Sequence, residues 1–264
     1  MIVAIGSLNV EADGIIQAGD YSQIAAPEDF VAYRSNTEGI PIVVLGGLGP
    51  ERAFRATTWV INEFSPEGII SLGFCGATKE YEQPGDMIVA FSVTRLMGTP
   101  FEWPDMKITD PLKPDRKLMI TALTAMELSG LDFHHGKTVT ISQPAITPGA
   151  KHWLGETMDS IAVDTQSHPI ASLATNASIP WVSVSSVLDH WDMNFPNSMY
   201  GIGTGPKTRG MATYISQLAS SPLEFPNLMR LGRSSAKAKS SLTTFTSAFM
   251  DFYAASSTEQ RNPR

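Results

Sequence analysis

Short runs of β-forming residues alternate with helical patterns along most of this chain, and this alternation limits the folds open to it. The β-rich runs cover residues 2–5, 40–45, 68–72, 86–93, 138–141, 161–163 and 180–188. Strands that alternate with helices predict a largely parallel sheet between helical layers. The runs 42–45 and 69–72 are apolar on both faces, as central strands of such a sheet must be. The pattern therefore predicts an α/β protein.

The composition changes near the C-terminal end. Residues 193–206 are rich in Asn, Pro, Gly and Ser, which predicts a long loop. Beyond it the strand pattern stops, and helices are predicted over the ranges 209–218, 226–239 and 242–253. We expect a domain over residues 1–206 and a helical extension over 207–264 that packs on it, with a frayed tail from about residue 256.

Charge and cysteine content exclude several classes of protein. A net charge of −7 leaves no basic excess for a phosphate backbone, so nucleic acid is not expected as the main partner. Cys75 is the only cysteine, which excludes a disulfide framework and favours a cytoplasmic location. No apolar run reaches the roughly 18 residues of a membrane span, and the five histidines are not spaced as metal ligands. A basic face with Arg230, Arg233, Lys237 and Lys239 is either solvated or a peripheral contact with anionic lipid.

Two glycine-rich segments follow predicted strands. Gly46-Gly-Leu-Gly49 is either a tight strand-to-helix turn or a place where backbone N–H groups face a ligand. Ser71-Leu-Gly-Phe-Cys-Gly-Ala77 is predicted as a second glycine turn that could line the same crevice. Cys75 within it is interpreted as a small apolar filler, since no His stands in a thiol-protease context.

Polar residues end the next two predicted strands. Residues 161–168 (Ile-Ala-Val-Asp-Thr-Gln-Ser-His) place a polar cluster before a helix, which His168 starts or packs against. Asp189 closes the long apolar run that follows. An Asp in this position is either a helix N-cap or a site acid.

These motifs, in this order, resemble the nucleoside phosphorylase/nucleosidase superfamily, which includes purine nucleoside phosphorylase and methylthioadenosine/S-adenosylhomocysteine nucleosidase. The resemblance covers roughly residues 1–196. Within the superfamily the chain is similar to the hopanoid-associated phosphorylases, thought to release adenine from adenosylhopane. The resemblance to them rests on the segments 49–53, 71–76, 164–168 and 189–196 and on the helical extension.

The resemblance implies a three-layer α-β-α sandwich around a mixed, partly closed sheet, in an enzyme that cleaves N-glycosidic bonds. Asp189 then resembles the acid that protonates N7 of the purine, and Glu11 the glutamate that orients the attacking water. Gln166 falls at the position of a sugar-binding glutamate. The substrate-binding positions that the resemblance implies are Gly47, Leu48, Phe74, Cys75, Gly76, Ile146, Thr147, Asp164, Thr165 and Gln166. No cofactor is implied, and a homo-oligomer is expected from the family.

The sequence departs from the family at several of these positions. Gln166 replaces a glutamate, and a neutral acceptor in place of an anion weakens a hydrogen bond by about 1–1.5 kcal/mol, which is roughly tenfold in rate. Thr165, Ser185 and Leu188 stand where Met, Arg and Ser are usual.

A further departure from the family bears on whether water or phosphate is the nucleophile. Phe74 occupies the position of a hydroxyl that phosphorylases present, and the candidate cations Arg52 and Arg55 suit a solvated helix face equally well. We therefore favour water, with inorganic phosphate as the alternative co-substrate. The leading hypothesis is hydrolysis of a 5′-substituted adenosine such as adenosylhopane. The alternatives are a methylthioadenosine/S-adenosylhomocysteine nucleosidase, a purine nucleoside phosphorylase, and a nucleoside-binding protein that has lost turnover.

Overall fold

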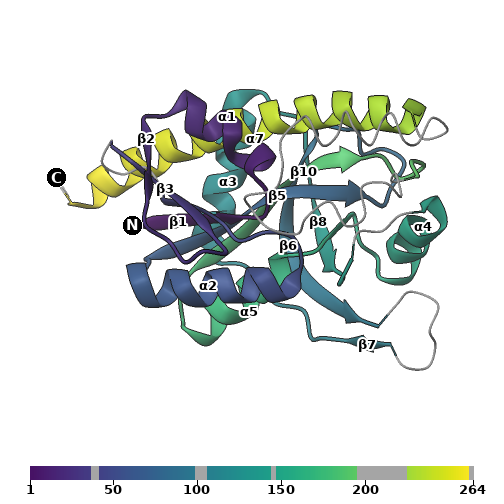
Figure 1. Cartoon of the computed structure of the whole chain (residues 1–264), viewed down its shortest axis with the longest axis horizontal. Coiled ribbons are helices and arrows are strands. Elements are labelled where there is room, and N and C mark those ends of the chain that lie inside the picture. Colours follow the sequence, from purple (N-terminus) through teal and green to yellow (C-terminus); the bar gives the residue numbers. More distant parts are fainter. Residues whose placement is uncertain (37–41, 99–105, 144–146, 195–224, 262–264) are drawn as a thin grey trace.

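Ten strands of the described residues form one sheet at the centre of the protein, with helices on both of its faces (Figure 1). The computed structural model describes residues 1–36, 42–98, 106–143, 147–194 and 225–261. The described strands run in the order β10-β6-β8-β9-β5-β1-β4-β3-β2, with β7 paired to β6. Their bounds are β1 Ile2–Gly6, β2 Tyr21–Ile24, β3 Val31–Ser35, β4 Ile42–Leu45, β5 Gly68–Ala77, β6 Met87–Met97, β7 Lys107–Ile108, β8 Phe133–Thr140, β9 Ala162–Asp164 and β10 Trp181–Asp189.

The sheet is mixed and closes on itself at one end. Strands β4, β1, β5 and β10 lie side by side in this order and run parallel to one another. Beyond β4, strands β3 and β2 extend the sheet with antiparallel pairing. Because β5 pairs with β10 as well as with β9, the path β5-β10-β6-β8-β9 returns to β5. This ring confirms the predicted mixed, partly closed sheet. It brings the ends of β5, β9 and β10 together.

Helices cover the sheet on both faces. The helices are α1 Asn9–Ala18, α2 Pro50–Phe64, α3 Arg116–Ser129, α4 Pro148–Thr157, α5 Ser167–Asn176 and α7 Phe225–Arg261. Apolar residues of α1, α3 and α7 share one core with the sheet, and those of α2 and α5 share the other. Figure 1 shows these two layers on opposite sides of the strands, with α4 beside the closed end. The predicted three-layer sandwich is therefore confirmed.

The C-terminal helix belongs to this core. Phe245 and Phe249 of α7 are almost fully buried against strand residues such as Val182. One continuous helix replaces the two that were predicted over 226–239 and 242–253. Gly232 lies inside this helix and does not interrupt it. The predicted helix 209–218 and the boundary at residue 206 lie outside the described residues.

Two glycine-rich segments have different structures. The segment 46–49 is a tight turn, because Gly47 and Gly49 adopt positive φ angles of 90° and 101° that favour glycine. The N–H groups of Gly46 and Gly47 bond to the carbonyls of Gly6 and Ser7, which leaves neither for a ligand. The segment 71–77 was predicted as a turn, and this was wrong because β5 continues to Ala77.

In the described residues, no helix has the length and apolar character needed to cross a membrane.

Candidate active site

Glu11 is fixed by the junction between β1 and α1. The helix begins two residues before it, so the free N–H groups of the helix start face its carboxylate. Oε2 accepts hydrogen bonds from the N–H groups of Ser7, at 2.7 Å, and Leu8, at 2.9 Å. Oε1 accepts one from the N–H of Phe74 on β5, at 3.2 Å. Glu11 thus joins the ends of two central strands while only 4% of its surface is exposed.

Burial gives Glu11 an unusual acidity. Loss of water raises the pKa of its carboxyl from 4.5 to about 7, although the three backbone N–H groups pull it down. The negative charge of Asp164 raises it further. A carboxyl with a pKa near 7 exists in both forms at neutral pH, which suits a group that must take up a proton.

Gln166 lies directly beside Glu11. Its Oε1 accepts a hydrogen bond from the hydroxyl of Ser7, and its Nε2 donates to the carbonyl of Leu72 at 3.4 Å. A Cβ atom at Gly73 would collide with Nε2 of Gln166 and would lie 3.0 Å from Oε1 of Glu11. Glycine is therefore required here for close approach. We call Ser7, Glu11, Gly73 and Gln166 the Glu11 cluster.

Asp164 holds the segment that carries Gln166. Its carboxylate accepts hydrogen bonds from Thr140 Oγ1, at 2.7 Å, and from the N–H groups of Gln166 and Ser167 at the start of α5. The hydroxyl of Thr140 also accepts from the N–H of His168. Asp164 was predicted to bind substrate, yet its oxygens are used within the protein. It acts on the site by placing Gln166.

Other described residues predicted to bind substrate lie in three different turns of the structure. Thr165 is buried in the turn between Asp164 and Gln166. Thr147 caps α4 by accepting a hydrogen bond from the N–H of Ala150 at 3.2 Å. Leu48 is half-buried in the turn before α2. Ile146 lies outside the described residues.

Asp189 forms a buried ion pair with Lys151. The carboxylate ends β10, and no helix starts in residues 190–194, so the N-cap interpretation is wrong. Lys151 on α4 has no exposed side-chain surface, and its Nζ contacts Oδ2 of Asp189. Nζ also donates to the carbonyls of His190, at 2.8 Å, and Met193, at 3.1 Å. We call Asp189 and Lys151 the Asp189 pair.

Burial is the largest influence on Asp189. It raises the pKa of the carboxyl, while the charge of Lys151 and the hydrogen bond from it pull the pKa down. A Cβ atom at Gly76 would lie 3.3 Å from Oδ1 of Asp189, so β5 approaches this carboxylate as it approaches the Glu11 cluster. Gly73 and Gly76 are three residues apart, which is roughly 10 Å along a strand.

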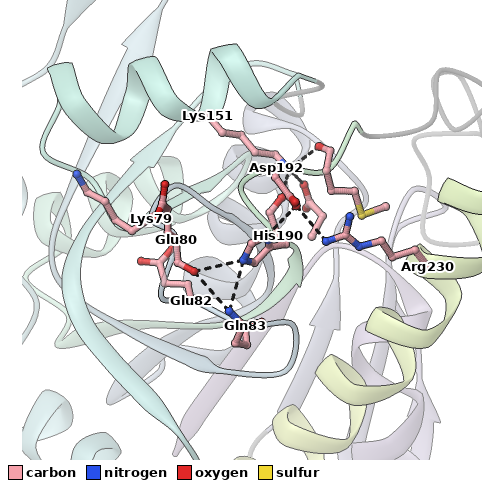
Figure 2. Close-up of polar contacts among 10 residues, drawn as sticks. Lys79, Glu80, Glu82, Gln83, Lys151, His190, Asp192 and Arg230 are labelled. Carbon is pink, nitrogen blue, oxygen red and sulfur yellow. Dashed lines mark hydrogen bonds and ion pairs between the residues drawn. The ribbon is translucent and has the colours of Figure 1, made fainter.

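The turn after β10 is held from two other elements, α4 and α7. Lys151 reaches it from α4, and Figure 2 shows this side chain together with His190, Asp192 and Arg230. His190 Nδ1 lies 2.7 Å from Asp192, which in turn pairs with Arg230 of α7 at 3.0 Å.

Cys75 lies on β5 between Gly73 and Gly76. Its side chain is buried, and burial raises the pKa of its thiol well above the usual value. The negative charges of Glu82, Asp164 and Asp189 raise this pKa further. This supports the interpretation of Cys75 as an unreactive filler.

Sequence reasoning missed two members of these clusters. Ser7 follows β1 directly, and its place beside the strand end was a signal that could have been used. Lys151 gave no such signal, because a lysine in a helix is usually exposed. Its role depends on the position of α4 at the closed end of the sheet.

Comparison with known proteins identifies the class of protein. A family model described as "Phosphorylase superfamily" matches residues 2–198. The chain belongs to this superfamily, which confirms the family expected from the motifs and the expected class of enzyme.

One related sequence and two solved structures are similar to this chain over most of its length. A 5′-methylthioadenosine/S-adenosylhomocysteine nucleosidase of Exiguobacterium sp. is 25% identical over 179 residues, which cover 65% of this chain and 76% of that protein. The futalosine hydrolase structure of Helicobacter pylori superposes with a TM-score of 0.71 and 15% identity, over 97% of each chain. A methylthioadenosine/S-adenosylhomocysteine nucleosidase of Neisseria meningitidis, in complex with methylthio-immucillin-A, gives a TM-score of 0.68 and 16% identity, over 95% of this chain and 97% of that one.

Proposed function

We propose that this protein hydrolyses the N-glycosidic bond of a purine nucleoside with a substituent on its 5′ carbon. One observation carries the proposal: two buried carboxyl groups with raised pKa values, Glu11 and Asp189, contact β5 near its carboxyl end. One of them can supply a proton and the other can take one up. The activities for which the relatives are named support the same class of reaction.

Each carboxyl group has one part of the reaction. Asp189, whose pKa is raised by burial, gives a proton to N7 of the purine, and the bond between the sugar and the base then breaks. Glu11 orients a water molecule toward the sugar carbon and takes its proton as the new bond forms. The products are the free base and the free sugar; Glu11 then releases its proton to solvent, and Asp189 takes one up for the next cycle. Gln166 is proposed to contact the sugar hydroxyls.

The arrangement of cations supports water over phosphate as the nucleophile. A phosphate dianion needs cations and donors around it. Of the two candidate cations, Arg55 is paired with Asp29 on the surface and lies 5.9 Å from the ring centroid of Phe30. The three donors of Lys151 are already used by Asp189, His190 and Met193.

The uncharged residues at the proposed substrate positions suggest which substituent the 5′ carbon carries. Phe74, Thr165, Gln166 and Ser185 place no charge where the substrate would lie. A bulky apolar 5′ group, as in adenosylhopane, fits such surroundings better than a charged homocysteine tail. Methylthioadenosine has an uncharged 5′ group too, and the Exiguobacterium relative is named for acting on it.

A second function is favoured by the contacts of Gln166. Both ends of its amide are hydrogen-bonded within the protein, to Ser7 and to Leu72. A sugar must replace at least one of these bonds. If that exchange is unfavourable, the chain binds a nucleoside without cleaving it.

Measurements of base release and of nucleoside binding separate these functions. The protein is incubated with adenosylhopane, methylthioadenosine, S-adenosylhomocysteine and inosine, with and without phosphate, and free base is measured. We expect base release from a 5′-substituted adenosine without phosphate. Release that requires phosphate would contradict hydrolysis. Micromolar binding of these nucleosides by calorimetry with no base released would support the binding protein instead.

A further inference from the structure

Lys151 is the residue near Asp189 that neither the motifs nor the proposed reaction assigns. It projects from the first turns of α4, and all of its side chain is buried. An ammonium group has three N–H donors. They are matched by three acceptors, namely Oδ2 of Asp189 and the carbonyls of His190 and Met193. The group is therefore saturated, and no donor remains for a substrate.

All three acceptors belong to one short segment. Asp189 ends β10, and residues 190–193 form a turn closed by the hydrogen bond from the N–H of Met193 to the carbonyl of His190. A hydrogen bond from a charged group is about twice as strong as a neutral one. Lys151 thus fixes both the carboxylate and the backbone that follows it.

We propose that Lys151 is a positioning residue that orients Asp189 and sets the pH at which this carboxyl loses its proton. The proposal rests on the proposed role of Asp189 as the acid. The cation stabilises the carboxylate form, whereas burial stabilises the protonated form. Their balance keeps Asp189 able to both give up and regain a proton.

Other charged groups around Asp189 do not replace Lys151. His190 is the next residue, and its positive form would stabilise the carboxylate, but its Nδ1 is paired with Asp192. From β5 and the residues beyond it, the thiol of Cys75 and the carboxyl of Glu82 face the same region, and neither can carry a positive charge. Asp164 of β9 also adds negative charge there. In the described part of the chain, Lys151 makes the only direct ion pair with Asp189.

The test compares pH–rate profiles of the parent and of Lys151→Met, which keeps the length of the side chain and removes its charge. Asp189 must be protonated to act, so kcat falls at high pH as its proton is lost. Without the cation, this fall should move to higher pH by about 1–3 units, the size of effect that an adjacent opposite charge exerts. Lys137→Met is the matched control, because Lys137 pairs with Asp159 on the surface and should leave the profile unchanged. An unchanged fall in Lys151→Met would overturn the proposal.

A second measurement needs no substrate. Thermal melts are recorded from pH 4 to pH 9 for Lys151→Met and for Lys151→Met/Asp189→Asn. In the single variant, the buried carboxyl binds its proton more tightly in the folded state than in the unfolded state, so the melting temperature should fall as pH rises. The double variant has no such carboxyl, and this part of the fall should disappear.

Equal pH dependence in the two variants would overturn the proposal even if the single variant were too unstable for kinetics. Failure to find any base release would contradict the proposed nucleosidase, but these melts would still test the coupling between Lys151 and Asp189.

Discussion

The Glu11 cluster and the Asp189 pair hold their buried carboxyl groups in different ways. Glu11 is surrounded by neutral donors, namely backbone N–H groups of Ser7, Leu8 and Phe74. Asp189 is bound by a full positive charge on Lys151. Both lie against β5: Glu11 is next to Gly73, and Asp189 is next to Gly76, three residues further along the strand. Neutral donors let Glu11 change its charge with little rearrangement, whereas a change at Asp189 leaves a buried cation without its partner.

The largest expected effect comes from breaking the Asp189 pair on one side. Asp189→Asn leaves the ammonium of Lys151 buried without a counter-charge, and the free energy of unfolding should fall by about 3–5 kcal/mol. Chemical denaturation at pH 7 measures this. Asp159→Asn, which removes the partner of a surface lysine, should leave stability unchanged within error. Equal effects of the two changes would mean that the buried pair is no different from the exposed one.

The next effect tests the neutral surroundings of Glu11. Its pKa is raised from 4.5 to about 7 in the folded protein, so its contribution to stability is fully present below about pH 4.5 and is lost as pH rises through about 7. The stability difference between the parent and Glu11→Gln should therefore move against the parent by up to about 3 kcal/mol over this range. Urea unfolding at several pH values measures it. A difference that is constant with pH would contradict the raised pKa.

Gly73→Ala should disrupt the Glu11 cluster and leave the Asp189 pair intact. The new Cβ would meet Gln166 and Glu11 directly, so we expect a loss of about 1–3 kcal/mol in the free energy of unfolding and a loss of base release. Gly232→Ala in α7 is the control, because a Cβ atom there would meet nothing within 4 Å among the described residues beyond its own stretch of helix. That change should stabilise the protein by about 0.5–1 kcal/mol.

The smallest effect concerns Gln166 itself. Gln166→Glu exchanges a neutral residue for an anionic one at the proposed sugar contact and should increase kcat/KM by roughly tenfold. It also places a second carboxyl beside Glu11, so the increase should be largest where one of the two is protonated. Base release measured across pH gives the result. A decrease at every pH would show that Gln166 does not contact the sugar.

The sequence predicted the fold well because its main signals are local. Alternating strand and helix patterns and doubly apolar strands such as 42–45 depend only on neighbouring residues. Segment 71–77 was predicted wrongly because its glycines suggest a turn, whereas Gly73 and Gly76 allow side chains from other elements to approach β5. That requirement is visible only once Gln166, Glu11 and Asp189 have been placed.

The site was predicted less completely than the fold. Glu11, Gln166 and Asp189 were found through a family resemblance, and the structure places Glu11 and Gln166 in one cluster. Asp164 was predicted as a substrate ligand, and the structure shows that it holds the start of α5. Lys151 was missed, since its partners lie 38 or more residues along the chain and α4 had not been placed against β10.

The role of Asp189 as the acid is tested most directly by measuring base release from a folded variant that lacks its carboxyl group. Lys151→Met/Asp189→Asn removes both members of the Asp189 pair without leaving a buried charge, so its melting temperature should remain close to that of the parent. With a 5′-substituted adenosine at neutral pH and no phosphate, the parent should release the base, and the folded double variant should release none above background. Equal base release by the two proteins would contradict the role of Asp189 as the acid.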